Sequence, residues 1–470
     1  MKQNHPVHRP GTVVDAPPST MSSIERRAVA ALSGIFSLRM LGLFMFLPVF
    51  SVHAHEYPGH TPLLIGVAIG IYGLTQGVFQ VPFGILSDRF GRRPVIAAGL
   101  LVFALGSVVA ALADDIWGIV AGRALQGMGA VAAAAMALAS DLTGETHRTR
   151  VMAIIGASIG AAFVLALVLG PVVTAAAGIA GLFWVTAAFA VVAIVLLYLG
   201  VPAPPRMTNT GAAALAGLTT ALRDGQMLRL NAGIFILHAI MVATFVALPI
   251  AIRDRAGIEV ADHWKAYVGV LLASVVFTVP LIVVADRTNR SRFVMLLGVA
   301  LLGAALAGLA GGSTGSVVLL ACMVVYFTGF NTLEASLPAM VSRVAPMRAR
   351  GAALGVYSTL QYLGAFTGGV IGGWLLGAGG ERAVLAACAG LCVGWMLIAI
   401  GLREPRRLSV EQLHIGAVER DSVDTLTARL LAVPGVIEAV VVVDERTAWL
   451  RVDRRRLDRT SLHALSSTGT

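Results

Sequence analysis

The sequence predicts an all-α membrane protein with twelve transmembrane helices in two six-helix bundles, followed by a small α+β domain at the carboxyl end. Composition is the first observation: 57% of the 470 residues are hydrophobic, 13% are charged, and the mean hydropathy is +0.83. An ordinary soluble protein does not have this balance. The second observation is that apolar runs of about 20 residues recur, the length that crosses a hydrocarbon layer of about 30 Å. The third is a charged segment, 403–470, with strand-like runs.

The apolar runs follow one another from residue 28 to residue 402. The longest connection between them, 201–227, opens with Pro202, Pro204 and Pro205 and separates two sets of six runs. We therefore expect bundles at 28–200 and 228–402, a linker at 201–227, and a disordered cytoplasmic tail at 1–27, which lacks apolar periodicity. The predicted spans are 28–52, 62–86, 94–113, 116–142, 150–176, 179–200, 228–252, 264–285, 293–311, 316–342, 351–376 and 383–402.

The net charge of +10 lies mostly in alternate loops. Because loops rich in Lys and Arg stay in the cytoplasm, this asymmetry predicts that both termini lie there. It also accounts for the positive net charge, so the charge does not indicate a nucleic-acid partner. The cytoplasmic set is Arg89, Arg92, Arg93, Arg148, Arg150, Arg206, Arg223, Arg229, Arg287, Arg290, Arg292, Arg343, Arg348 and Arg350, and the opposite set is Arg253, Arg255, Lys265 and Arg382.

The cysteines and the motif content argue against an enzyme. Cys322, Cys388 and Cys392 all lie inside apolar runs, so we expect neither a disulfide nor a metal site. No nucleophile elbow, phosphate loop or metal-spaced ligand set is present in the sequence. We expect no cofactor.

The turn after the second span reads Gly84-Ile-Leu-Ser-Asp88-Arg-Phe-Gly-Arg92-Arg. Asp88 and Arg92 are spaced to form an ion pair at the membrane surface. The stretch resembles the loop signature of the major facilitator superfamily, Gly-x-Leu-x-Asp-Arg-x-Gly-Arg-Arg. The resemblance implies that Gly84, Asp88 and Arg92, with Asp141 at the end of the fourth span, form a charge relay across helices 2, 4 and 11. That relay would close the cytoplasmic side when the pocket faces outward.

The two halves resemble each other at a constant offset. Asp286 and Arg290 stand 198 residues after Asp88 and Arg92, while the position that matches Asp141 is Ala339. We therefore expect a relay in the first half only. Internal repeats of this kind place a ligand site near the midplane between the halves.

Small residues mark helices 5 and 11 in the same register. Gly368 and Gly369 stand 198 residues after Gly170 and Pro171. Gly170-Pro171 resembles the start of the antiporter signature Gly-Pro-x-x-Gly-Gly, although Thr174 and Ala175 replace its last pair. The pair either supports exchange transport or is a simple helix kink.

Ionisable groups deep in a membrane are costly, so each is a functional candidate. Arg123 lies in Arg-Ala-Leu-Gln-Gly-Met-Gly-Ala, which resembles the helix 4 signature of proton-driven members of the superfamily. It either lowers the pKa of nearby acids or only bridges helices by hydrogen bonds. Arg39, in the first span, either holds an anionic group or pairs with Glu334.

Glu334 is the one carboxylate well inside a predicted span, and Asn331 lies one turn earlier on the same helix face. Glu334 either binds a proton or a cationic substrate in a central cavity, or is a neutral acid bonded to a neighbouring helix. His238 either titrates near physiological pH or is a packed polar group.

The segment after residue 402 has helix-like and strand-like pieces that favour a ferredoxin-like domain. Its turn Leu-x-x-Val-Pro-Gly-Val resembles that of heavy-metal-associated domains but lacks their Cys-x-x-Cys ligands, so we expect no metal there. The last strand of the fold is missing or very short. The predicted pieces are a possible strand at 408–415, a helix through Val423, Leu426 and Leu430, strands at 436–443 and 449–453, and a helix at 457–465.

The resemblance, which extends to the drug and proton antiporter group, implies a proton-coupled efflux antiporter of small lipophilic or cationic compounds in a bacterial inner membrane. Its partners would then be protons, a small-molecule substrate and the lipid bilayer. Proton-coupled uptake or uniport is an alternative within transport. A membrane sensor or scaffold that signals, or self-associates, through 403–470 is an alternative of another class.

Overall fold

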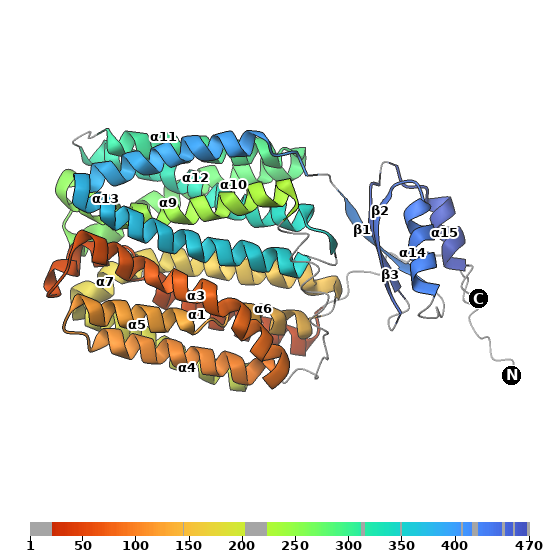
Figure 1. Ribbon diagram of the computed structural model, residues 1–470, viewed down its shortest axis with the longest axis horizontal. Helices are drawn as coiled ribbons and strands as arrows, with labels where there is room; N and C mark the ends of the chain where they lie inside the picture. Colours follow the sequence, from red (N-terminus) through yellow and green to blue (C-terminus); the bar gives the residue numbers. More distant parts are fainter. Residues whose placement is uncertain are drawn as a thin grey trace, which may run out of the picture.

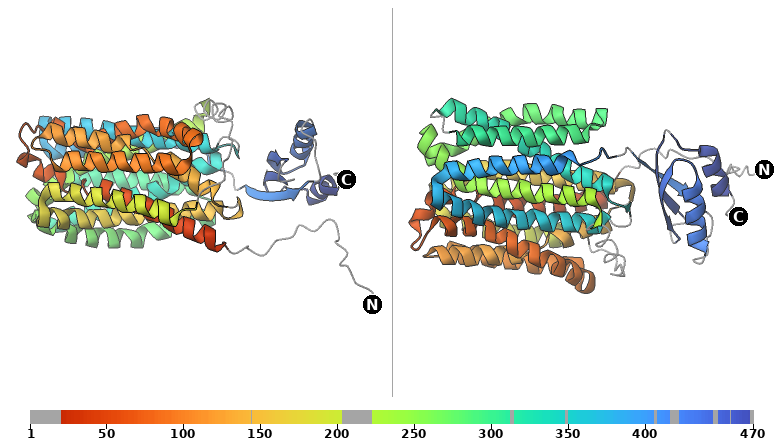
Figure 2. Two further views of the ribbon diagram at one scale, coloured as in Figure 1. Left: turned by 90° about the horizontal axis from the view of Figure 1, so that it is seen from below. Right: turned by 45° about the horizontal axis from the view of Figure 1, so that its top comes forward.

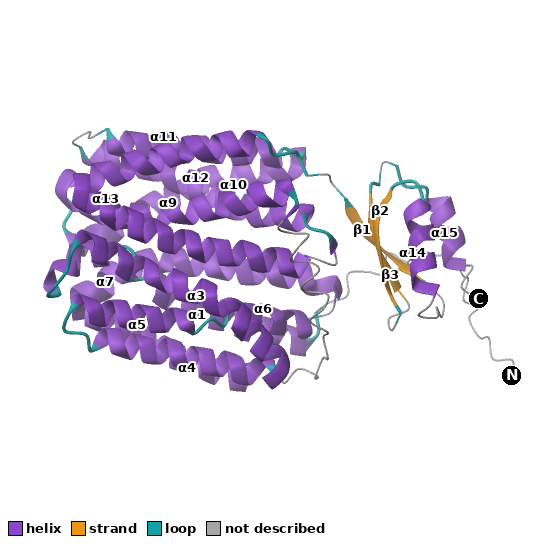
Figure 3. Cartoon of the chain, viewed as in Figure 1, coloured by secondary structure: helices purple, strands orange, loops and turns teal. Residues whose placement is uncertain are grey.

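The computed structural model describes residues 21–143, 145–202, 223–311, 315–347, 350–405, 408–415, 422–443, 447–454 and 456–467. Most of the predicted tail at 1–27 and of the predicted linker at 201–227 lies outside these ranges. The described chain forms a body of long, roughly parallel helices and a separate small domain that holds all of the strands (Figures 1 and 3).

The helices of the body are long and apolar enough to cross a membrane. Ten helical segments meet this description within the residues that the structure covers, and two of them, Arg150–Gly200 and Arg350–Ile400, have 51 residues each. The helices are α1 (Ser23–Phe44), α2 (Phe50–His53), α3 (Pro62–Phe90), α4 (Arg92–Ala111), α5 (Ile116–Met128), α6 (Ala132–Asp141), α7 (Glu145–Gly200), α9 (Gly225–Ala256), α10 (His263–Thr288), α11 (Ser291–Ala310), α12 (Ser316–Val344) and α13 (Arg350–Ile400).

The two longest segments each contain two spans. A straight helix of 51 residues would be about 76 Å long, more than twice the hydrocarbon thickness of about 30 Å. The backbone of α7 leaves helical geometry at Gly178, and that of α13 at Gly379 and Gly380. Positive φ values of 68° at Gly178 and 71° at Gly380 suit glycine, which has no Cβ to clash. Eight single and two double segments give the twelve predicted spans.

The fourth span is not the continuous helix that the sequence predicts for 116–142. It is divided into α5 and α6, and the break follows Gly129, whose carbonyl accepts a hydrogen bond of 3.4 Å from Arg39 Nη2. A Cβ on Gly129 would overlap the carbonyl oxygen of Gly99 in α4. The helix is therefore interrupted where it approaches α4 most closely, beside a buried guanidinium.

α3 from the first half and α13 from the second half meet along a seam of small residues. A side chain on Gly66 would overlap Gly369 O, and one on Gly73 would overlap Tyr362 O. Farther along the same helices the contact ends: a Cβ on Gly84 would meet only Ala133, and one on Gly355 would meet nothing within 4 Å. The halves are thus closed together toward the start of α3 and apart toward its Asp88 end.

The other predicted packing glycines also lie at close helix contacts. A Cβ on Gly368 would overlap Ala239 O of α9, and one on Gly170 would overlap Met45 O after α1. Pro171 lies inside α7. These positions hold α13 and α7 against the helices that carry His238 and Arg39.

The C-terminal domain has the order β1 (Ser409–His414), α14 (Val423–Ala432), β2 (Val436–Val442), β3 (Thr447–Val452) and α15 (Arg459–Ser467). Its antiparallel sheet has the strand order β1-β3-β2. In Figures 1 and 3 both helices cover one face of the sheet. This is the ferredoxin-like arrangement without a fourth strand in the described part of the chain.

The domain lies at the end of the body that also carries the start of α1 and the α3–α4 turn (Figures 1 and 2). Arg451 of β3 connects the two: its Nη1 donates to Ala345 O at 3.0 Å and contacts Glu438 at 3.2 Å, and its Nη2 donates to Arg343 O. Glu438 in turn accepts the Met347 N–H at 2.9 Å. The sheet is therefore bonded to the end of α12, in the second half.

Candidate functional site

Arg39 of α1 is fully buried, and its Nη2 atom makes its hydrogen bonds. Nη2 donates to Tyr72 Oη and to Gln76 Oε1 of α3, each at 2.5 Å. The guanidinium also lies 5.8 Å from the ring centre of Tyr72 and 5.6 Å from that of Phe103. Nε and Nη1 have no hydrogen-bond partner of normal geometry. The N–H groups of Nε and Nη1 are therefore available to a further acceptor.

Arg123 of α5 is just as deeply buried, but its donors are occupied. Nη1 donates to Gln126 at 2.8 Å, and Nε and Nη2 donate to the carbonyls of Ala68 and Ile69 in α3 at 3.4 and 3.5 Å. Gln126 continues the chain to Ser107 of α4. Among the described residues, no carboxylate forms an ion pair with Arg123 or Arg39. The contacts of Arg123 match the helix-bridging alternative.

The second half has a different set of polar groups at its centre. Glu334 Oε2 of α12 lies 3.8 Å from His238 Nε2 of α9. Gln361 of α13 contacts His238 Nε2 at 2.8 Å and donates to Glu334 Oε1 at 3.5 Å. The Glu334 side chain is 40% exposed although it lies in the middle of a spanning helix, whereas that of His238 is 9% exposed. Asn331 is half-buried and takes no part in the contacts described here for this trio.

Tyr362 of α13 connects the two centres. It interacts with Arg39 from the first half and, at longer range, with Glu334 from the second. Next to this connection an aromatic wall, which we define as Phe44, Phe163, Phe245 and Phe330, crosses between the halves. Phe163 of α7 lies 5.0 Å from Phe44, 6.3 Å from Phe245 and 6.0 Å from Phe330, measured between ring centres. The interface thus combines charged groups with an apolar surface.

The α3–α4 turn holds the predicted cluster of charges. Arg92 contacts Asp88 at 2.5 Å, Asp141 at 3.1 Å and Ser87 at 2.7 Å. Asp88 is 48% exposed and Asp141 16%. The carbonyl of Gly84 accepts the Ser87 hydroxyl at 2.7 Å. Arg92 therefore ties α3 and α4 to α6, and its described ion pairs do not extend to helix 11, which is the first part of α13.

The second half also has an ion pair at this end, and the expectation of a relay in the first half only stays a prediction. Asp286 of the second half forms an ion pair of 2.7 Å with Arg343, at the end of α12, and Arg343 also donates to Ser291. Each half therefore has its own ion pair at this end.

Comparison with known proteins decides the family. The family model described as "Major Facilitator Superfamily" matches residues 32–271 and 263–442.

The chain belongs to the major facilitator superfamily. It is 42% identical over 441 residues to "Inner membrane transport protein YajR" of Escherichia coli (strain K12), covering 93% of this chain and 97% of that one. It is 26% identical to "Multidrug resistance protein MdtH" of Edwardsiella ictaluri, covering 73% and 85%. The D-xylose-proton symporter shares the fold, with a TM-score of 0.61 at 17% identity over 81% of this chain and 98% of the other.

Members of the superfamily to which this chain is similar are transporters, so the protein is a multi-pass membrane transporter and not an enzyme. The described residues contain no group of three or more His, Cys, Asp or Glu side chains placed to hold a metal ion. The polar centres are therefore candidates for binding and conformational change.

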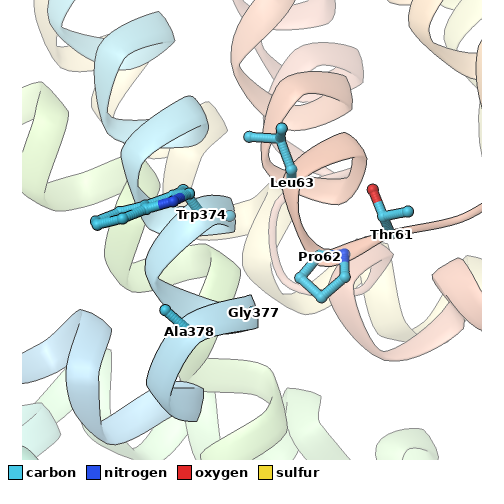
Figure 4. Close-up of a pocket in the computed structure, with 7 residues that line it drawn as sticks. Thr61, Pro62, Leu63, Trp374, Gly377 and Ala378 are labelled. Atoms are coloured by element: carbon cyan, nitrogen blue, oxygen red, sulfur yellow. The ribbon is translucent and has the colours of Figure 1, made fainter.

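Two surface recesses lie away from the polar centres. The first, about 340 Å³, lies at the closed end of the seam, between Thr61, Pro62 and Leu63 at the start of α3 and Trp374, Gly377 and Ala378 of α13 (Figure 4). The second, about 410 Å³, is lined at the other end by Arg290, Arg292, Phe293, Leu296 and Glu404. Neither contains a residue of the Arg39 or Glu334 centre, and we assign no binding role to either.

The sequence analysis missed three polar residues of the interior. Gln361 joins Glu334 to His238, and Tyr362 faces both halves. Asn231 of α9 is 2% exposed, and both of its amide atoms lack a hydrogen-bond partner. Gln361 and Asn231 could have been recognised from the sequence, because each places a neutral amide inside an apolar run. Burying an amide without a hydrogen bond is costly, so such a residue is a candidate for a polar contact.

Proposed function

We propose that the protein is a proton-coupled antiporter that exports small lipophilic compounds from a bacterial cytoplasm across the inner membrane by alternating access. The observation that carries this proposal is the Glu334–His238–Gln361 trio. It places a partly exposed carboxylate 3.8 Å from an imidazole in the middle of the bundle. A carboxylate at this depth is costly unless it binds a proton or a cation, and a cationic compound would compete with the proton for the same carboxylate.

The seam between α3 and α13 supports alternating access. The halves touch through glycines at one end and separate at the other, as a rocking motion of two rigid bundles requires. The arginine-rich loops assign the separated end to the cytoplasm. In this orientation the separation between α3 and α13 opens toward the cytoplasm, where both termini lie.

The ion pairs at the separated end are proposed as gating elements. Arg92 holds α3, α4 and α6 together, and Arg343 holds α12 to Asp286. Two rigid ends can then meet when the cytoplasmic side closes. Entry of one proton down a potential of 100 mV supplies about 2.3 kcal/mol for the cycle.

Reconstitution into proteoliposomes tests the function. Vesicles loaded with a pH-sensitive dye should report proton movement when a lipophilic substrate is added on one side, and an imposed pH gradient should drive substrate accumulation against its concentration. Glu334→Gln should abolish this coupling. Substrate movement that ignores the pH gradient would favour uniport instead.

A sensor is the second candidate, because Arg451 bonds the C-terminal domain to the end of α12, the helix of Glu334. A chain that ends at residue 402 discriminates the two. A transporter should keep substrate flux without the domain, whereas a sensor should lose its output.

A further inference from the structure

Arg39 carries a positive charge that no carboxylate of the described chain pairs with, and it has buried hydrogen-bond donors left over. It is 1% exposed, and Nε and Nη1 have no partner. A second guanidinium, Arg123, lies in the same bundle, and Tyr72 contacts both cations. Aromatic faces compensate a buried cation only in part. Because ions in a membrane interior are costly, an unpaired arginine is retained at this depth when it has an anion to bind in part of the cycle.

The surroundings of Arg39 fix the direction of its N–H groups. Gln76 Oε1 and Tyr72 Oη accept hydrogen bonds from Nη2 and so orient the guanidinium. The fourth span is interrupted at Gly129, whose carbonyl also accepts from Nη2. Nε and Nη1 are therefore held ready for a ligand that accepts hydrogen bonds.

The position of Arg39 explains how a ligand reaches it. Tyr362 of α13 covers it from the opposite half, at the level where Gly73 of α3 packs on Tyr362 O. Arg39 is therefore buried in this conformation, and a ligand from the cytoplasm reaches it when Tyr362 moves away from the guanidinium. The rings of Tyr72 and Phe103, whose centres lie 5.8 and 5.6 Å from the guanidinium, provide an apolar surface for the rest of a ligand.

We infer that Arg39 binds the anionic head of the substrate, and that the substrate class is lipophilic compounds with one carboxylate. The direction of transport rests on the proposed function, but the binding does not. Export of a monoanion in exchange for an entering proton moves two charges in the direction that an inside-negative potential favours. Fixed cations in one half and a titratable acid in the other give the two ligands separate sites.

Three probes with the same phenylalkyl chain test the charge preference: 4-phenylbutyrate, its isosteric amide 4-phenylbutanamide, and 4-phenylbutylamine. Thermal stabilisation of the purified full chain should give a dissociation constant for 4-phenylbutyrate about tenfold or more below that of the amide, because charge-assisted hydrogen bonds are the strong ones. Arg39→Gln should remove this difference. Equal binding of the acid and the amide by the wild type, or preference for the amine, would overturn the inference.

A second variant keeps the test decisive if Arg39→Gln does not fold. Arg39→Lys retains the charge but not the guanidinium fork, so it should still prefer the acid over the amide, with weaker binding. An acid-to-amide ratio in Arg39→Lys equal to that of the wild type would show that Arg39 does not contact the ligand.

Transport by the same probes separates this inference from the proposed function. If 4-phenylbutylamine exchanges for protons in proteoliposomes and 4-phenylbutyrate does not bind, the inference fails while the proposed function stands. If 4-phenylbutyrate binds through Arg39 but no probe responds to a pH gradient, the inference stands and the proposed function fails.

Discussion

The two halves of the molecule have the same helical architecture but opposite interiors. The first half buries Arg39 and Arg123 without a carboxylate ion pair among the described residues. The second half places Glu334 beside His238 and Gln361. Tyr362 is the residue where the two interiors meet.

The difference shows how the two halves of a duplicated fold can take different electrostatic roles. A guanidinium stays charged at every physiological pH, so the first half presents a constant field. A carboxylate beside an imidazole changes charge with its protonation, so the second half presents a variable one. The attraction between the halves then depends on the proton, while their packing through glycines allows either contact or separation.

The largest expected effect comes from preventing the halves from meeting. Gly66→Val puts a branched side chain where even a Cβ would overlap Gly369 O. Overpacking of about 2 kcal/mol would reduce the closed population roughly thirtyfold and transport with it. Gly269→Val is the control, since a Cβ there meets nothing within 4 Å and should leave proteoliposome flux near the wild-type value. Normal flux through Gly66→Val would show that this seam does not need to close.

The next largest effect on transport is expected from a substitution that removes the variable charge of the second half. Glu334→Gln keeps the shape and the bond to Gln361 but cannot ionise, so substrate affinity should lose its dependence on pH. Transport driven by a pH gradient should fall by about tenfold or more, the range of a lost proton-transfer group. Glu381→Gln, which alters a carboxylate beside the α13 kink, is the matched control. A wild-type pH profile in Glu334→Gln would assign the proton to another group.

The sequence predicted the charged members of both interiors, because Arg39, Arg123, His238 and Glu334 interrupt apolar runs where charge is costly. It did not predict Gln361 or Tyr362, since uncharged polar residues are common in such runs. Their importance depends on contacts with Glu334, His238 and Arg39, which only the folded structure shows. The twelve spans followed from length and hydropathy. The break at Gly129 could not be predicted, because it depends on the close approach of Gly99 on another helix.

A smaller effect is expected where the halves resemble each other most, at their terminal ion pairs. Asp141→Asn removes a partly buried partner of Arg92 and should cost about 1 kcal/mol, which shifts the balance toward the cytoplasm-open state roughly fivefold. Asp286→Asn removes a partner that is 66% exposed and should shift it less. The labelling rate of a single cysteine at Gly355→Cys reports the opening. Equal rates in both variants and the parent would exclude these pairs from gating.

The smallest effect on transport is expected from detaching the C-terminal domain. Arg451→Ala removes bonds to the carbonyls of Arg343 and Ala345. Hydrogen exchange of the Met347 amide, which donates to Glu438, should then accelerate by about tenfold, while flux stays within about twofold. Arg454→Ala, which loses an exposed ion pair inside the domain, should leave Met347 protected. Unchanged exchange in Arg451→Ala would mean that other contacts hold the domain.

The central claim is that a proton on the second half controls contact with the first. Spin labels at Leu63 of α3 and Trp374 of α13 flank the recess at the closed end of the seam (Figure 4), so their separation reports whether the halves are in contact there. Lowering the pH should lengthen this distance in the otherwise wild-type protein, because a neutral Glu334 no longer attracts Arg39 across Tyr362, and the distance should not change with pH in Glu334→Gln. A distance that is independent of pH in both proteins, or a pH response that survives Glu334→Gln, would contradict the account.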